Sequence, residues 1–226
     1  MPIMKKTRIT ALAALPLSAV LLSGCGGGPV RAGAAALVGD ERITVADLDR
    51  TVRVWRPEFK ADPQAGAVRG EPPEQQQQMG TDAASESDVR ATLSTLVFLR
   101  IGDRAARDNG VEPTGGDVDQ ALAMMDQAPT SNAVSMTLAA GLPKDRVRDV
   151  ARFNAIQILL MDRFGWDHTP NSPTARQAML RFDQALADAA AKLKVRVNPR
   201  FGTFDPAKVT ISPVVYRLSA TESGVR

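Results

Sequence analysis

Apolar residues recur at steps of three and four along most of this chain, which is the period of an amphipathic α-helix. The expected helices, bounded by capping residues, glycines or prolines, cover residues 45–56, 87–108, 114–128, 131–140, 143–164 and 173–193. Within the fifth helix, residues 153–161 are apolar on most sides, which predicts that this helix is central and buried. The pattern therefore predicts a mainly α-helical fold.

Three short segments have the composition or alternation of β-strands. Residues 36–38 lead into the tight turn at Gly39-Asp40, while residues 195–197 and 209–211 alternate after the last helix. A strand needs a partner for its backbone hydrogen bonds. Residues 36–38 have no near partner beyond their own turn and residues 195–197 have none, so the sequence allows these two segments to pair and to join the two ends of the fold. We expect residues 209–211 to form an edge strand.

Residues 60–86 carry prolines, glycines and a run of four glutamines, with almost no periodic apolar residue. Such a composition buries too little apolar surface to become ordered. We expect this insert to be disordered or loose, with its glutamine run in solvent. The expected organisation is a single helical domain over residues 35–212 and a C-terminal tail over residues 213–226.

The first 24 residues have the layout of a secretory signal peptide. Lys5, Lys6 and Arg8 precede an apolar core at residues 9–22. This core is too short for a stable transmembrane helix, which needs about 20 residues. We expect residues 1–24 to be removed during export.

The apolar core ends in Leu22, Ser23, Gly24 and Cys25, which resemble the lipobox of bacterial lipoproteins. The resemblance implies cleavage after Gly24 and a diacylglyceryl group on Cys25, and we expect no other cofactor. Cys25 is the only cysteine, so it has no internal disulfide partner. An ordinary signal peptide with an unmodified cysteine is the alternative. If Cys25 carries the lipid, residues 25–34 form a glycine-rich tether to the outer face of the cytoplasmic membrane.

Charge and composition exclude some classes of protein. The net charge of +3 leaves with Lys5, Lys6 and Arg8, so the mature chain has 25 basic and 25 acidic residues. Charge therefore gives no reason to expect a nucleic-acid partner. Aromatic residues make up only 4% of the chain, which disfavours a β-sandwich or barrel rich in aromatic strands.

Two segments, residues 36–49 and 195–205, resemble the beginning and the end of the SurA-like and PrsA-like exported chaperones. The motif residues are Val38, Gly39, Ile43, Thr44, Asn198, Pro199, Arg200, Phe201 and Gly202. The resemblance implies a SurA N-terminal-domain-like helical bundle in which the first and last strands pair and the closing helix packs on the N-terminal helices. We expect the motif residues to be structural, with Asn198 tightening a turn and Arg200 bonding carbonyls or an acid of the N-terminal helices.

Members of that family often carry a parvulin prolyl isomerase domain between the long helix and the closing helix. Only residues 165–172 lie there in this chain, far fewer than the roughly 40 that a domain needs. The resemblance then implies a lipid-anchored, non-enzymatic holdase for unfolded or partly folded exported proteins. A scaffold lipoprotein with one dedicated partner is the alternative, and the oligomeric state is left open.

Candidate catalytic and metal-binding residues are few. His168 is the only histidine and lies beside Asp167; a Ser-His-Asp site would have to use it, but no nucleophile elbow accompanies it. No cysteine and histidine cluster fits zinc. Two Asp-x-Asp pairs, at residues 47–49 and 117–119, lack the rest of a calcium loop and are typical of first-turn acids.

Methionines and tryptophans are the remaining candidates for a binding surface. Five methionines lie at helical spacing, at Met124, Met125, Met136, Met161 and Met179. Methionines can line an adaptable groove, but we expect these five to belong to the core. We expect the same of Trp55 and Trp166.

Overall fold

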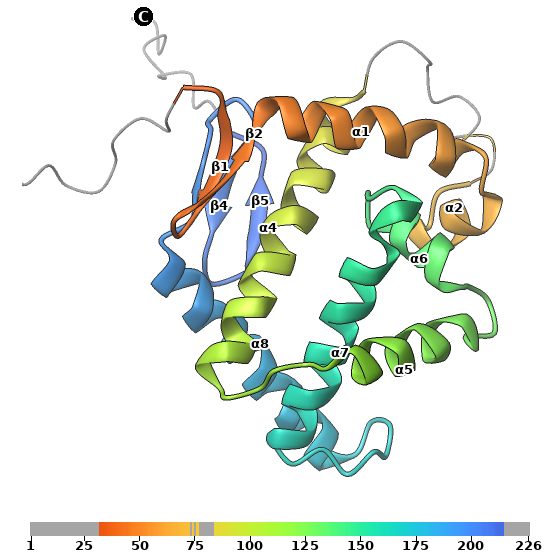
Figure 1. The fold of residues 1–226 in the computed structure, drawn as a ribbon, viewed down its shortest axis with the longest axis vertical. Helices are drawn as coiled ribbons and strands as arrows, with labels where there is room; N and C mark the ends of the chain where they lie inside the picture. Colours follow the sequence, from red (N-terminus) through yellow and green to blue (C-terminus); the bar gives the residue numbers. More distant parts are fainter. Residues whose placement is uncertain (1–31, 73, 75, 77–83, 215–226) are drawn as a thin grey trace, which may run out of the picture.

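The structure is a computed structural model that describes residues 32–72, 74, 76 and 84–214 (Figure 1). The strands are β1 (Ala34–Val38), β2 (Glu41–Thr44), β3 (Arg196–Val197), β4 (Thr203–Asp205) and β5 (Thr210–Ser212). The helices are α1 (Val45–Lys60), α2 (Pro63–Arg69), α4 (Glu86–Asp108), α5 (Gly115–Asp126), α6 (Ala133–Ala139), the 3₁₀ turn η1 (Lys144–Arg146), α7 (Val147–Arg163) and α8 (Pro173–Leu193). The predicted mainly helical class is confirmed.

Several sequence predictions lie outside the described residues. These are the signal peptide, the lipobox at residues 22–25, most of the tether and most of the C-terminal tail. The tether was expected to extend through residue 34, but β1 already begins at Ala34. Within the part of the chain that the structure describes, no helix has both the length and the hydrophobicity required to cross a membrane.

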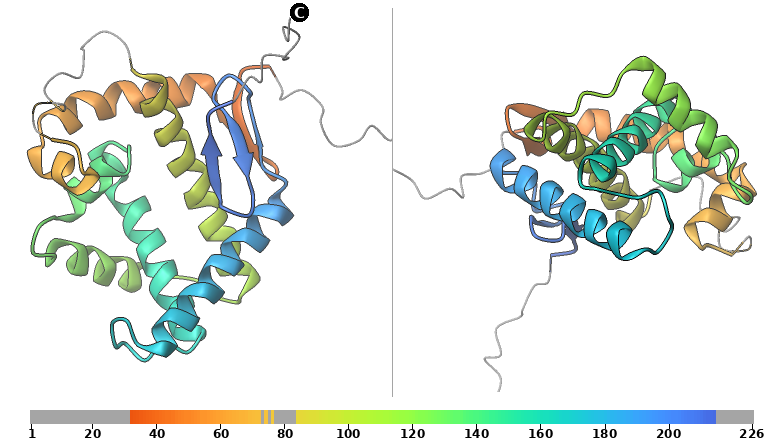
Figure 2. Two further views of the ribbon diagram at one scale, coloured as in Figure 1. Left: turned by 180° about the vertical axis from the view of Figure 1, so that it is seen from behind. Right: turned by 90° about the horizontal axis from the view of Figure 1, so that it is seen from below.

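The predicted pairing of the two chain ends is confirmed. β1 is the centre of a three-stranded antiparallel sheet in the order β2-β1-β3, with Ala36 opposite Val197 and Leu37 opposite Arg196. Ile211 lies in β5, but its partner β4 was not expected from the sequence pattern. The β4–β5 hairpin lies behind β1 and α4 in Figure 1 and in front of them in the reversed view of Figure 2.

The central helix is α4, which packs against α1, α7 and α8. The apolar residues along one side of α4 lie in the core as predicted, with Leu93, Val97 and Ile101 at most 1% exposed. α7 was expected to be buried on most sides, and this prediction is only partly right, because Ile158 and Leu159 are half-buried. An amphipathic pattern places a helix against the core but does not say how many neighbours cover it.

α1 does not end before Pro57 as expected, but continues to Lys60. A proline inside a helix costs about 3 kcal/mol. The additional turn buries Phe59 completely, and this ring stacks on the equally buried Trp55 with 5.1 Å between centroids. Burying such a side chain contributes about 1.5–3 kcal/mol, which offsets most of the cost. The core position predicted for Trp55 is confirmed, and its indole Nε1 donates to the carbonyl of Leu138 at 2.7 Å.

The prediction of a loose, solvated insert at residues 60–86 is wrong where the structure describes it. α2 packs on α6, and Gln76 of the glutamine run is only 3% exposed. Its Nε2 atom donates to the carbonyls of Phe59 and Asp62 at 2.6 and 2.7 Å. A polar side chain that satisfies the carbonyls at a helix end becomes ordered without an apolar pattern. Residues 73, 75 and 77–83 lie outside the described residues.

The prediction that the methionines belong to the core holds for only some of them. Met125 and Met161 are 5% and 6% exposed, whereas Met124 and Met179 are 50% and 39% exposed. Met136 and Trp166 are half-buried. The exposed methionines lie on separate helices, α5 and α8, so they do not by themselves indicate a binding surface.

Candidate binding groove between α4 and α7

α4 and α7 approach each other closely because a glycine faces an aromatic ring. A Cβ atom at Gly102 would lie 2.6 Å from two ring carbons of Phe153, well inside van der Waals contact. Glycine therefore lets this ring lie directly on the α4 backbone. The ring also packs against Phe98 and Phe182, with centroid distances of 4.7 and 6.3 Å. The cluster sets the spacing of α4 and α7.

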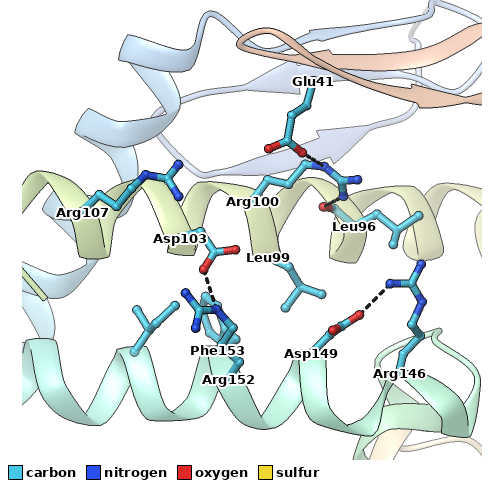
Figure 3. Close-up of a pocket in the computed structure, with 11 residues that line it drawn as sticks. Glu41, Leu96, Leu99, Arg100, Asp103, Arg107, Arg146, Asp149, Arg152 and Phe153 are labelled. Atoms are coloured by element: carbon cyan, nitrogen blue, oxygen red, sulfur yellow. Dashed lines mark hydrogen bonds and ion pairs between the residues drawn. The ribbon is translucent and has the colours of Figure 1, made fainter. Parts of the chain in front are cut away.

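A groove of about 240 Å³ lies along these two helices and reaches the β1–β2 turn (Figure 3). Its apolar lining residues are Leu96, Leu99, Phe153 and Ile156. Its charged lining residues are Glu41, Arg100, Asp103, Arg107, Arg146, Asp149 and Arg152. Leu99 and Phe153 are half-buried, so the groove offers apolar surface between charged side chains.

Three ion pairs position the charged side chains. They join Arg100 Nε to Glu41 Oε2 at 2.8 Å, Arg152 Nε to Asp103 Oδ1 at 3.0 Å and Arg146 Nη1 to Asp149 Oδ2 at 2.6 Å. All three pairs are partly exposed, and such pairs contribute only about 0–1 kcal/mol to stability. Their effect is on geometry. Figure 3 shows the Arg100–Glu41 pair on the strand side of α4 and the other two pairs toward α7.

A second, broader groove of about 780 Å³ meets the first at Glu41 and Arg107, which line both. It lies where the β1–β2 turn, the last turns of α4 and the junction of α8 with β3 come together. Its charged lining residues are Asp40, Glu41, Arg104, Arg107, Lys192, Lys194 and Arg196. Cations thus outnumber carboxylates in its lining, and we name it the basic groove.

Asp108 links two of these cations. Its carboxylate accepts hydrogen bonds from Arg104 Nε at 2.7 Å and Lys192 Nζ at 3.0 Å. Burial alone would raise the pKa of Asp108, but the hydrogen bonds and charges of Arg104 and Lys192 outweigh it and lower the pKa below its ordinary value. The negative carboxylate therefore ties the last turn of α4 to that of α8.

The lining of the two grooves has the chemistry of a binding surface. Among the described residues, this lining contains no serine, threonine, cysteine or histidine, which are the usual nucleophiles and the imidazole base. No group of three or more histidine, cysteine or carboxylate side chains that could hold a metal ion occurs among the described residues. What the grooves offer is apolar surface, fixed carboxylates and guanidinium groups.

His168 lies elsewhere, on the loop between α7 and α8. It is exposed, and its ring lies 4.7 Å from that of Trp166 between centroids, tilted by 40°. Its Nε2 atom lies 3.4 Å from the Asp162 carboxylate rather than on Asp167. Asp167 instead accepts the hydroxyl hydrogen bond of Ser172 at 2.8 Å. Hydrogen bonds from Thr174 and Ser172 lower the pKa of Asp167. The histidine, the acid and the serine do not form a relay.

The two sequence motifs come together in the sheet, as the expected structural role requires. The backbone N–H of Asn198 donates to the carbonyl of Ala35 at 2.8 Å, and its side chain donates to that of Ala34 at 3.1 Å. Asn198 also accepts a bond from the backbone N–H of Arg200 at 3.1 Å, which tightens the turn around Pro199. Gly39 donates its N–H to Leu193 at 2.8 Å.

The remaining motif residues lie in the same region. Ile43 and Phe201 are buried at 3% and 7% exposure, and Thr44 caps α1 by accepting from the N–H of Asp47 at 3.0 Å. The prediction for Arg200 is wrong. Its guanidinium carbon lies 5.6 Å from the ring centroid of Phe201, and no acid contacts it among the described residues.

The groove residues were not expected from the sequence. A signal was present on α4, where Arg100, Asp103, Arg104 and Arg107 follow one another at steps of three, one and three on the polar side of the apolar stripe. Such a charged face is usually only solvated. Its partners on the β1–β2 turn, α7 and the end of α8 are distant in sequence, so only the folded chain identifies the groove. Two of the motif residues, Val38 and Gly39, line the basic groove.

No family model matches this chain, and no match was found among curated proteins or solved structures.

Proposed function

We propose that this protein is a lipid-anchored, non-enzymatic chaperone of the holdase type that binds exported polypeptides in the groove between α4 and α7. The observation that carries the proposal is the groove itself, in which half-buried apolar side chains lie between fixed ion pairs. An unfolded chain offers apolar side chains on a polar backbone. A surface on which apolar and charged side chains alternate can contact both the apolar side chains and the polar backbone of such a chain.

The size of the groove favours a polypeptide over a small molecule. Pockets for drug-sized ligands measure about 300–1,000 Å³ and bury most of the ligand. The α4–α7 groove alone has only about 240 Å³, and it joins a second groove of about 780 Å³, so the two form an extended surface rather than a single pocket. Weak contacts of this kind suit a holdase, because a client has to be released again.

The anchor follows from the lipobox resemblance at Cys25. Two acyl chains hold a protein on a membrane firmly, where a single chain gives marginal binding. Ala34 of β1 lies nine positions after Cys25, and at about 3.3 Å per position this length spans at most roughly 30 Å. The folded body would therefore work close to the membrane from which exported chains emerge.

The test of holdase activity is suppression of client aggregation by the chain from residue 26 onward, which contains every described element. Light scattering would follow several unrelated clients diluted from denaturant. We expect suppression by the wild type, and weaker suppression by Leu99→Gln, which changes the groove. Leu180→Gln is the matched control, because Leu180 is 70% exposed and lines neither groove. No suppression of any client at molar excess would refute the holdase proposal.

Two further experiments complete the test. A photoreactive residue at position 99 would crosslink the proteins that bind in the groove. Many different crosslinked proteins would favour the holdase, and a single stoichiometric partner would favour the dedicated scaffold. For the anchor, Cys25→Ala in the full chain should move the protein from the membrane fraction to the soluble fraction. An unchanged membrane fraction would contradict the lipid anchor.

A further inference from the structure

Positive charge is concentrated along the two joined grooves. Their lining contains the cations Arg100, Arg104, Arg107, Arg146, Arg152, Lys192, Lys194 and Arg196. It contains the acids Asp40, Glu41, Asp103 and Asp149. The mature chain as a whole has as many acidic as basic residues. A neutral protein thus collects an excess of cations on one continuous concave surface.

The excess lies at one end of this surface. At the α4–α7 end, each of the three arginines Arg100, Arg146 and Arg152 has its own carboxylate, so this end is close to neutral. At the basic groove, Asp108 supplies one negative charge to both Arg104 and Lys192. The surface is therefore apolar and neutral at one end and positive at the other.

Helix dipoles explain only part of this arrangement. A cation in the last turn of a helix interacts favourably with the helix dipole, which accounts for Arg107 in α4 and Lys192 in α8. It does not account for Arg196, which lies in β3. Nor does it explain why the fold brings the ends of both helices and β3 to one groove.

We propose that the joined grooves select extended client segments in which an acidic residue lies about four residues from an apolar one. This inference rests on the proposed function and names the substrate class of the same site. Leu99 and Arg107 are eight residues apart on α4, which is about 12 Å at 1.5 Å per residue. An extended chain covers that distance in about four residues. The apolar side chain would contact Leu99 and Phe153, and the carboxylate would lie at Arg107 and Lys194.

The shape of the surface favours a polypeptide over the anionic face of a membrane. Its cations line grooves of about 240 and 780 Å³ between two helices and a strand turn. A bilayer surface contacts protruding cations but does not enter a groove, whereas a single extended chain does. The apolar lining at Leu99 and Phe153 has no counterpart in a layer of lipid headgroups.

The experiment measures the binding of labelled peptides to the chain from residue 26 onward by fluorescence anisotropy at low and high salt. The first peptide carries an apolar pair and, four residues on, two aspartates. The others replace the aspartates by lysines or by serines, or move them next to the apolar pair. We expect the first peptide to bind about tenfold more tightly than the lysine peptide, with a preference that falls as salt rises.

Matched variants locate the effect. Arg107→Gln/Lys194→Gln should weaken binding of the acidic peptide about five- to tenfold, as expected when partly exposed ion pairs are lost. Binding of the serine peptide should be unchanged. Arg50→Gln/Lys208→Gln removes the same charge from exposed positions outside both grooves. This control should not change the binding of either peptide. Equal weakening by both double variants would overturn the inference.

The outcomes separate this inference from the proposed function. If the serine peptide binds but charge and spacing make no difference, the selectivity is refuted and the holdase proposal stands. If no peptide binds, both fail. Vesicles of anionic phospholipid provide the remaining comparison. Vesicle binding that Arg107→Gln/Lys194→Gln abolishes, without an effect on the peptides, would assign the basic groove to a lipid surface and overturn the inference.

Discussion

Gly202 is the motif residue whose replacement should damage the fold most clearly. It has a φ of +138°, which residues with a side chain rarely adopt. A Cβ atom there would lie 2.4 Å from the carbonyl oxygen of Ser212 and 2.8 Å from Cγ2 of Ile211. Gly202→Ala therefore strains the backbone and forces β4 and β5 apart at the start of their two-stranded sheet.

The magnitude follows from two separable costs. A side chain in a sparsely populated backbone region costs about 1–3 kcal/mol, and overpacking a closed site costs about 1–3 kcal/mol more. We expect Gly202→Ala to lower the free energy of unfolding by about 2–6 kcal/mol. Gly165→Ala is the matched control, since Gly165 has a φ of +92° but no described atom within 4 Å of the added Cβ. It should cost only about 1–2 kcal/mol.

The assay is urea unfolding of the chain from residue 26 onward, followed by far-ultraviolet circular dichroism. A shift of the midpoint without a change in slope reports stability alone. Gly115→Ala is a second control, because Gly115 has neither a positive φ nor a described neighbour within 4 Å of the added Cβ, and it should leave the midpoint nearly unchanged. Equal losses for Gly202→Ala and Gly165→Ala would refute the close contact between residue 202 and β5.

Three further predictions concern single residues. Gln76→Ala removes one buried and one partly buried hydrogen bond, to the carbonyls of Phe59 and Asp62, and should cost about 1–3 kcal/mol. Exposed Gln120→Ala is the control, and equal effects of the two variants in urea unfolding would show that Gln76 is solvated. Trp55→Phe removes the bond to Leu138 and part of a fully buried ring and should cost about 2–4 kcal/mol, whereas a neutral result in thermal unfolding would contradict the packing of α1 on α6. The lowered pKa of Asp108 means that its carboxylate stabilises the fold at pH values above its ordinary pKa, and this contribution is lost as the pH falls below about 4. In Asp108→Asn the urea midpoint should therefore fall less between about pH 4 and pH 2 than in the wild type. An equal fall in both proteins would show that the carboxylate is not linked to folding.

The chain by itself determined most of the helices and the joining of its two ends. Steps of three and four in α4 and α8 come from local geometry, and caps such as Thr114 with Asp117 are read within four residues. The pairing of β1 with β3 was expected from the resemblance of the two end segments to one family and from the lack of any near partner for residues 195–197. Asn198 tightens the turn around Pro199 as expected, because its side chain accepts a hydrogen bond from a residue only two positions away.

Tertiary structure decided the insert, the end of α1 and the groove. Gln76 is ordered because its side chain donates to the carbonyls of Phe59, near the end of α1, and of Asp62, the N-cap of α2. α1 continues past Pro57 because Phe59 finds a buried partner in Trp55. Neither reason is visible in a local pattern. The grooves require side chains from the β1–β2 turn, α4, α7 and the end of α8 at one place. Charged residues on an amphipathic helix have the same pattern whether they face solvent or one another, so only the packing of distant segments turns them into a site.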